Sequence, residues 1–97
     1  MKSRLAFPAG HAVFEGHFPG RPLVPAVALL AEVLAAVEAD TALGADAWTL
    51  SSAKFLVPAG PGTELTLAHD ETLGGRRFDI RAGDTLVASG TLSRRMP

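Results

Sequence analysis

The chain has 97 residues, a formal net charge of −1, 47% apolar residues and no cysteine. This length fits one domain over residues 1–97 and leaves no room for a second core. The absence of cysteine excludes disulfide frameworks and thiolate metal sites and favours the reducing cytoplasm. The basic residues are scattered, which argues against nucleic-acid binding, and no apolar run is long enough to predict a membrane span.

The N-terminal part of the chain predicts a strand, an ordered loop and a helix. Residues 3–7 can form a short strand, and the proline- and glycine-rich residues 8–25 hinder both helix and central strand. Pro25 suits the first turn of a helix, because its missing N–H would have had no intrahelical partner. Strong helix formers then predict a helix over residues 25–39. Its apolar residues occupy every face, which is typical of a helix surrounded by protein.

The remainder of the chain predicts a run of antiparallel strands. A β-rich segment ends at the breaker sequence PAGPG, and three segments of alternating apolar and polar residues follow it. Turns are expected at Gly74-Gly75 and at Gly83-Asp84. One buried helix and such hairpins predict an α+β domain, in which an antiparallel sheet wraps around one long central helix. The expected strands span residues 48–57, 63–69, 77–81 and 86–92.

The loop before the predicted helix is the candidate for chemistry. Its sequence GHFPGRPLVP, residues 16–25, is dense in conformationally special residues, and loops held this firmly often position a functional group. His17 is the titratable candidate in this loop. A neutral imidazole can take a proton from the carbon next to a thioester carbonyl. The alternative for a lone loop histidine is a capping or solvent-facing role.

The segment from Gly16 to Val27 carries a resemblance to a known family. It matches GHFPG-x-P-x-x-PGV, the hallmark of the FabZ-like and FabA-like 3-hydroxyacyl-acyl carrier protein dehydratases, with Ala26 in place of the usual glycine. Weaker similarity continues over most of the chain, for example at residues 61–65 and 88–92. The short length and the lead-in HAVF make the chain most similar to the small dehydratases of aryl polyene pathways.

The resemblance implies a hot-dog fold and a homodimer with two acyl tunnels at its interface. The implied reaction dehydrates a 3-hydroxyacyl chain, carried on the phosphopantetheine arm of an acyl carrier protein, to the trans-2-enoyl product in fatty acid, polyene or polyketide-type biosynthesis. No metal or bound redox cofactor is implied. Self-association is also expected from the positive mean hydropathy of so short a chain, because a small core leaves apolar surface to bury.

The same resemblance assigns roles around His17. The motif histidine acts as the base at the α carbon, the Leu23 carbonyl fixes its tautomer, and the backbone N–H of Ala26 polarises the thioester carbonyl. Helix N-termini do present free donors to developing negative charge. The residues expected to bind substrate are Phe18, Pro19, Gly20, Leu23, Pro25, Ala26 and Val27.

The proton donor is where the chain departs from the family pattern. In the family, a carboxylate on the partner's helix delivers a proton to the departing β-hydroxyl, but the matching position here is Ala31. Glu32 follows, turned by about 100° around the helix. Three interpretations of Glu32 stay open: the working acid after a local shift, a polar neighbour on a solvent-reaching face, or a structural ion pair across the dimer. The predicted catalytic residues are thus His17 and Glu32.

Two other functions are alternatives to dehydration. A hot-dog thioesterase would use a carboxylate to activate water on the same thioester, but it would not explain the GHFPG-type loop. A catalytically degenerate subunit would bind acyl carrier protein, or would pair with a second dehydratase-like chain that supplies the missing carboxylate. Ala26 and Ala31 are the residues that suggest this second alternative.

The other polar residues are assigned simpler roles. His69 ends a predicted strand and is expected to be exposed. Arg76 and Arg77 are expected to be solvated turn charges, with a patch for an acidic carrier protein as the alternative. His11 and His17 lack a convincing third ligand, so no metal site is predicted.

Overall fold

The computed structural model describes residues 2–7 and 24–95 of the chain. Among these residues, no helix is both long and apolar enough to cross a membrane. The elements in chain order are β1 (Lys2–Leu5), α1 (Ala26–Thr41), the short 3-10 helix η2 (Ala45–Ala47), β2 (Trp48–Phe55), β3 (Leu65–Thr72), β4 (Gly75–Ala82) and β5 (Thr85–Arg94).

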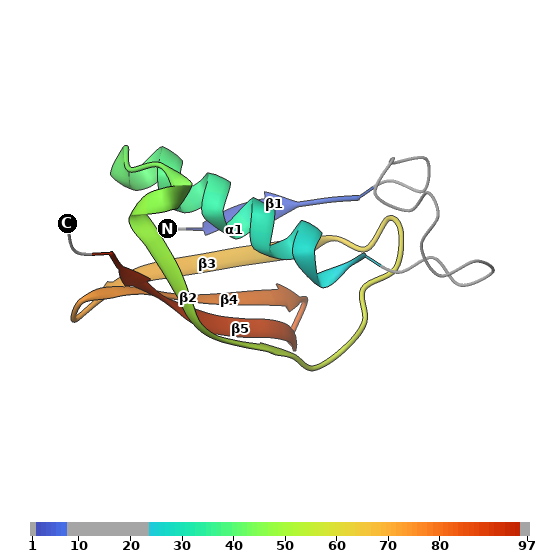
Figure 1. Ribbon diagram of the computed structural model, residues 1–97. Coiled ribbons are helices and arrows are strands. Elements are labelled where there is room, and N and C mark those ends of the chain that lie inside the picture. Colours follow the sequence, from blue (N-terminus) through green and yellow to red (C-terminus); the bar gives the residue numbers. More distant parts are fainter. Residues whose placement is uncertain (1, 8–23, 96–97) are drawn as a thin grey trace.

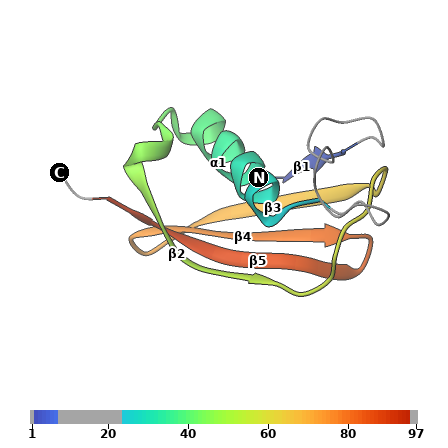
Figure 2. The same cartoon turned by 45° about the vertical axis from the view of Figure 1, so that its right-hand side comes forward.

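The strands form one antiparallel sheet in the order β1-β3-β4-β5-β2. The helix α1 lies along one face of this sheet (Figure 1; Figure 2). Gly74 (φ 81°) and Gly83 (φ 58°) turn the two hairpins of the β3-β4-β5 meander, in a backbone conformation that other residues rarely adopt. A single long helix packed against such a sheet confirms the predicted α+β class and the hot-dog fold.

The helix α1 begins one residue after the predicted start, at Ala26, and ends two residues beyond the predicted end. Pro25 precedes the first helical residue with an extended backbone, φ −63° and ψ 146°. Ala42 ends the helix in the left-handed conformation, with φ 61°. Its N–H donates to the carbonyl of Glu38 at 2.8 Å, which satisfies one of the carbonyl groups that a helix end leaves without a partner.

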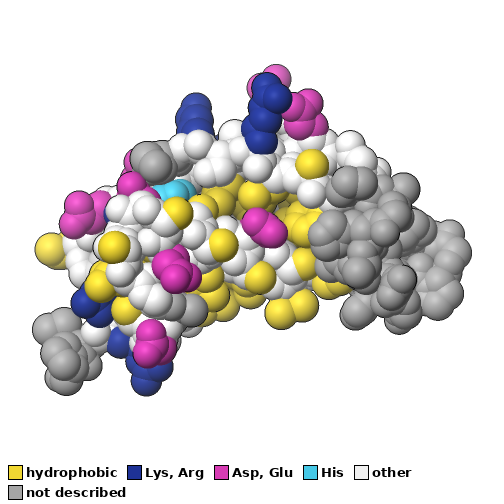
Figure 3. Space-filling view, turned by 90° about the horizontal axis from the view of Figure 1, so that it is seen from above, with side chains coloured by type: hydrophobic (Ala, Val, Ile, Leu, Met, Phe, Trp, Pro, Cys, Tyr) yellow, Lys and Arg dark blue, Asp and Glu magenta, His cyan; other side chains and the backbone are white. Residues whose placement is uncertain are grey.

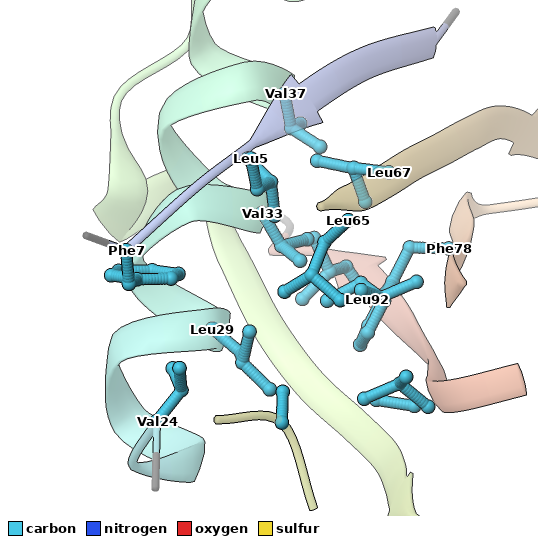
Figure 4. Packing of buried hydrophobic residues seen from close by; sticks show 14 residues of the cluster. Leu5, Phe7, Val24, Leu29, Val33, Val37, Leu65, Leu67, Phe78 and Leu92 are labelled. Carbon is cyan, nitrogen blue, oxygen red and sulfur yellow. The ribbon is translucent and has the colours of Figure 1, made fainter. Parts of the chain in front are cut away.

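One face of α1 packs against the sheet. Leu29, Val33 and Val37 follow one another at a spacing of one turn and are 3%, 0% and 0% exposed. Figure 4 shows their side chains in one cluster with those of Leu65 and Leu67 from β3. The other faces of α1 hold many exposed residues, although they are also largely apolar. Within a single chain the helix is therefore buried along one side only.

The sheet supplies the other half of the core through alternation. Leu65 and Leu67 on β3, and Phe78 and Ile80 on β4, are buried, while the residues between them are more exposed. Burying one such side chain contributes about 1.5–3 kcal/mol. This apolar cluster is therefore the main source of stability in the described part of the chain. Its remaining members are Leu5, Phe7, Val24, Ala59, Val87, Ala88 and Leu92.

An irregularity in β2 decides which of its side chains face the helix. The pairing of β2 with β5 shifts between Leu50 and Ser52, so Ser51 is an extra residue in the strand. Trp48 and Leu50 line a cavity with residues of α1 before the shift, and Phe55 lines another after it. Both serine hydroxyls form hydrogen bonds with hydroxyls on β5. Because side chains of a regular strand alternate between its two faces, Trp48 and Phe55 would otherwise point to opposite faces. The extra residue lets both face the helix.

Two predictions for polar residues are wrong. His69 is 1% exposed, because it lies inside β3 on the same face as Leu65 and Leu67. Arg76 lies in β4 instead of a turn, and its side chain is 13% exposed and forms an ion pair with Asp40. The burial of His69 and Arg76 could not be predicted from the sequence. A polar residue on the inward face of a strand cannot be distinguished from a solvent-exposed one until its partner is known. Arg77, the next residue, is exposed as predicted.

Gly90 on β5 provides a test of this packing. A Cβ atom there would lie 2.3 Å from the carbonyl oxygen of Ser52 and 2.7 Å from the ring of Phe78. We expect Gly90→Ala to lower the free energy of unfolding by about 1–3 kcal/mol, measured by chemical denaturation. The control is Ser89→Ala, at the adjacent position, which should change it by less than about 0.5 kcal/mol. Equal unfolding free energies for the two variants would contradict the described packing.

Candidate active site

The described residues contain one part of the predicted site. Ala26 and Val27 open α1 directly after Pro25, and Glu32 lies in the second turn of the helix. Of the three consecutive residues Pro25, Ala26 and Val27, only Ala26 lines the cavity at this end of the helix, and Val27 is 72% exposed. The remaining predicted site residues lie outside the described residues, and their roles stay predictions: His17, Phe18, Pro19, Gly20 and Leu23.

A cavity of about 260 Å³ lies at the N-terminus of α1. One wall comes from the start of the helix, and the other comes from the end of β2 and the segment after it. The backbone N–H of Val24 donates to the carbonyl of Ala59 at 2.7 Å and ties the two walls together. The described lining residues are Val24, Ala26, Leu29, Phe55, Leu56, Val57, Pro58 and Ala59.

The helix start places backbone donors at this cavity. Pro25 has no N–H, and its carbonyl accepts from the N–H groups of Ala28 at 3.0 Å and Leu29 at 3.3 Å. The N–H groups of Ala26 and Val27 lie in the first turn, where no intrahelical acceptor exists. The helix dipole adds partial positive charge at this end. A carbonyl oxygen that gains negative charge would be stabilised here.

The described walls of the cavity carry no charged side chain. Apolar walls strengthen hydrogen bonds to a reacting group where water is kept out, but in the single chain this cavity is partly open, with Leu56 of its wall 54% exposed. It also suits an apolar ligand better than a charged one. Among the described residues, no three His, Cys, Asp or Glu side chains lie close enough together to hold a metal ion.

Further apolar surface lies beside the cavity along the β2 edge of the sheet. A second cavity of about 110 Å³ lies between α1 and β2 and includes Val33, Trp48 and Leu50 in its lining. β2 is an edge strand, and apolar side chains around it are exposed. Figure 3, which looks onto the helix side, shows apolar side chains gathered along the helix and beside it. The exposed apolar residues near this edge are Val27 (72%), Leu50 (44%), Phe55 (44%), Leu56 (54%) and Val57 (41%).

Glu32 does not line either apolar cavity. It and Ala31 are both exposed in this chain, one turn after the start of α1 and away from the buried stripe that includes Leu29 and Val33. In the described part of the chain, no hydrogen bond or ion pair involves the Glu32 carboxylate. An intrachain structural role for this carboxylate is therefore without support. Its three predicted roles all concern a partner chain or solvent, and they remain predictions.

Comparison with known families places the chain among dehydratases. A model of the ApeI-like family, described as ApeI dehydratase, matches residues 1–91. The chain belongs to the ApeI-like dehydratase family. This membership confirms the resemblance found in the sequence, and it supports a hydro-lyase activity in general terms. The cavity at the start of α1 is thus the candidate active site of a dehydratase fold.

Two solved structures are similar to almost the whole chain. A chain of the dehydratase heterocomplex ApeI:P from Xenorhabdus doucetiae is 30% identical, with a TM-score of 0.70, and the match covers 97% of this chain and 86% of that one. An uncharacterized protein from Erwinia carotovora subsp. atroseptica is 29% identical, with a TM-score of 0.75, and the match covers 95% of this chain and 79% of that one. Both similarities support the hot-dog fold.

The sequence predicts one lining residue of the cavity, Ala26, and misses Val24 and Leu29 on the same wall as well as the whole opposite wall. The motif predicts Pro25, Ala26 and Val27 as site residues, whereas residues 55–59 are predicted only as a strand end and a breaker. A signal for the second wall was present: Phe55 and Val57 are apolar residues at the very end of a strand, just before the PAGPG breaker. The sequence cannot tell that this segment returns to the helix start, because that depends on the pairing of β2 with β5.

The lining of the cavity predicts how it responds to a larger side chain. Ala26→Leu adds bulk at the cavity, and we expect it to weaken binding of an apolar fluorescent probe by about tenfold, a difference of about 1.4 kcal/mol. Fluorescence titration measures this affinity. Ala39→Leu, an exposed position near the other end of α1, is the matched control and should leave it unchanged. Equal weakening by both variants would show that the probe binds somewhere else.

Proposed function

We propose that the chain is a hydro-lyase that dehydrates a 3-hydroxyacyl group carried on acyl carrier protein to the trans-2-enoyl form. The observation that carries this proposal is the uncharged cavity at the start of α1, whose wall includes Val24 and Ala26 from the end of the matched segment of residues 16–27. Val24, at the C-terminal side of that segment, is buried in the wall of the cavity. Membership of the dehydratase family supports the reaction class.

The proposed chemistry divides among three groups. The neutral imidazole of His17 takes the proton from the α carbon of the thioester, and the electron pair of that bond moves toward the carbonyl. The N–H of Ala26 donates to the carbonyl oxygen as it gains negative charge. The electron pair then returns to form the α–β double bond while the β-hydroxyl leaves. Glu32 of a neighbouring chain is the proposed donor that protonates this hydroxyl to water. Protons move and no electron carrier is needed, so the proposal includes no redox cofactor.

A second chain of the same fold is part of the proposal. The exposed apolar residues around β2 and Val27 form a surface that a single chain leaves in water, and such surfaces mark interfaces. Among the described strands β2 lies at the edge of the sheet, and an edge strand offers backbone groups for association. The similar ApeI:P structure is described as a dehydratase heterocomplex. The partner is therefore proposed to be another copy or a dehydratase-like chain.

A heteromeric subunit is the second candidate function, and the exposed Ala31 favours it. If a partner supplies the carboxylate, this chain contributes the His17 side of the site and depends on that partner for turnover. A thioesterase would use a carboxylate to activate water on the same thioester, and the GHFPG-type loop would have no role in that reaction.

His17 carries the test of the proposed reaction. We expect His17→Ala to lower turnover of a 3-hydroxyacyl carrier protein by about 10²–10⁴-fold, because it removes the base. The conversion is followed by mass spectrometry of the carrier protein, which loses one water. His11→Ala is the control for loss of a histidine and should retain activity. Full activity in the His17→Ala protein would refute the assignment of the base.

Glu32 and Ala31 give a second test with opposite outcomes. If Glu32 is the acid, Glu32→Gln keeps the shape of the side chain but loses proton transfer, and the rate should fall by about 10²–10⁴-fold. Ala31→Glu should then help little, because a second carboxylate beside the first raises the cost of ionising both. If Glu32 is a bystander, Glu32→Gln leaves the rate unchanged and Ala31→Glu raises it. Steady-state kinetics of the two variants separates the cases.

A further inference from the structure

A buried histidine joins the C-terminal end of α1 to the sheet, at the opposite end of the helix from the cavity. Nδ1 of His69 on β3 lies 3.3 Å from Nη1 of Arg76 on β4. Nη2 of the same guanidinium lies 2.8 Å from Oδ2 of Asp40, in the last turn of α1. These three side chains, which we name the Asp40–Arg76–His69 latch, connect three elements through one guanidinium.

The geometry of the latch requires a neutral His69. A guanidinium only donates hydrogen bonds, so Nδ1 of His69 must accept from Arg76 and carries no proton. The ring proton is then on Nε2. Burial is the largest effect that lowers the pKa of His69 below its ordinary value, and the charge of Arg76 lowers it further. The imidazole is thus neutral at neutral pH.

Charged groups from several elements act on His69. The Arg76 guanidinium on β4 and the amino-terminal charge of the chain disfavour the imidazolium, while Asp40 on α1 and Asp70 on β3 favour it. Burial and the two positive charges outweigh the two carboxylates, since the net direction is downward. Protonation would turn Nδ1 into a donor that faces a donor, and it would place two cations side by side.

We propose that the latch releases the last turn of α1 from the β3–β4 hairpin when the surroundings become acidic. Among the described residues, the Asp40–Arg76 ion pair is the one that joins α1 to the sheet. Val37 is the last buried residue of the helix, and Glu38 is exposed. A cavity of about 300 Å³ beside Arg76, lined also by Thr41 and Glu71, gives the guanidinium space to move away.

The direction of the pH effect follows from proton linkage. The folded chain binds the His69 proton more weakly than the unfolded chain does, because the pKa is lowered on folding. The stabilisation by the neutral ring is therefore complete above the ordinary value of 6.5, and it is lost as the pH falls from there through the folded-state pKa. Each unit by which the pKa of His69 differs between the folded and the open chain changes the equilibrium constant for opening by about tenfold.

Amide hydrogen exchange on the full chain tests the local nature of this release. Between neutral pH and about pH 5, protection factors of the last-turn amides of α1 should fall by about tenfold, after correction for intrinsic exchange. The amides of Leu67 and Ile80 in the core strands exchange through global unfolding, so their protection also falls with the pH-dependent loss of stability, but it should stay well above that of the helix end at every pH. Unchanged protection of the helix end, or a helix end that is protected as well as the core strands at low pH, would overturn the proposal.

Variants of the latch add a directional test by NMR titration of the His69 imidazole. Arg76→Gln removes the neighbouring cation and should raise the pKa of His69 and shift the release to higher pH. Asp40→Asn removes a carboxylate that favours the imidazolium and should lower this pKa further. His69→Gln should abolish the pH dependence of the helix end, and His11→Gln should leave it unchanged. Shifts in the same direction for Arg76→Gln and Asp40→Asn would contradict the latch even if His69→Gln fails to fold.

Discussion

Leu29, Val33 and Val37 lie one turn apart on α1, and their burial against the sheet holds the helix in a fixed position over the strands. The position of both ends of the helix follows from this contact. Its N-terminus lies over the end of β2 and forms the uncharged cavity there. Its C-terminus reaches β4, where Asp40 meets Arg76. A single apolar stripe thus positions both the start of α1 at the candidate active site and the end of α1, where Asp40 contacts Arg76.

The elements of the fold were largely predictable from local sequence. Pro25 and the alanine- and leucine-rich segment after it predict the start of α1, and alternation predicts the strands that contain Leu65 and Ile80. Features that depend on strand pairing were not predictable. In the sequence, the only trace of the register shift at Ser51 is a pair of consecutive serines. The burial of His69 depends on a hydrogen bond with the guanidinium of Arg76, which lies seven residues later in the sequence.

The residues of the candidate site also include some that the sequence predicts and some that it does not. The motif predicts the residues at the start of α1, because each of its prolines and glycines restricts the backbone locally. The wall that contains Phe55 and Ala59 comes from a distant strand, and it required the three-dimensional arrangement. Glu32 is exposed in the single chain, so its proposed role as the acid requires a neighbouring chain, whereas a role as a polar residue on the helix surface requires only solvent.

The exposed apolar surface around β2 links the fold to the proposed function. Val27 and Leu56 leave more than half of their surface in water, at 72% and 54% exposure, close to the cavity. A partner that covers them would also complete the enclosure of the site. Association of two chains is therefore part of the proposed reaction, and the absence of a carboxylate at position 31, which is Ala31, bears on both.

The most direct test of the central claim is to trace the oxygen atom of water into the product of the reverse reaction. A trans-2-enoyl carrier protein is incubated with the protein in water labelled with heavy oxygen, and the products are weighed by mass spectrometry. The proposed hydro-lyase places the label on the β carbon of a 3-hydroxyacyl group that remains attached to the carrier protein. Label found instead in a released free acid, with no hydroxyacyl carrier protein formed, would contradict the account and indicate a thioesterase.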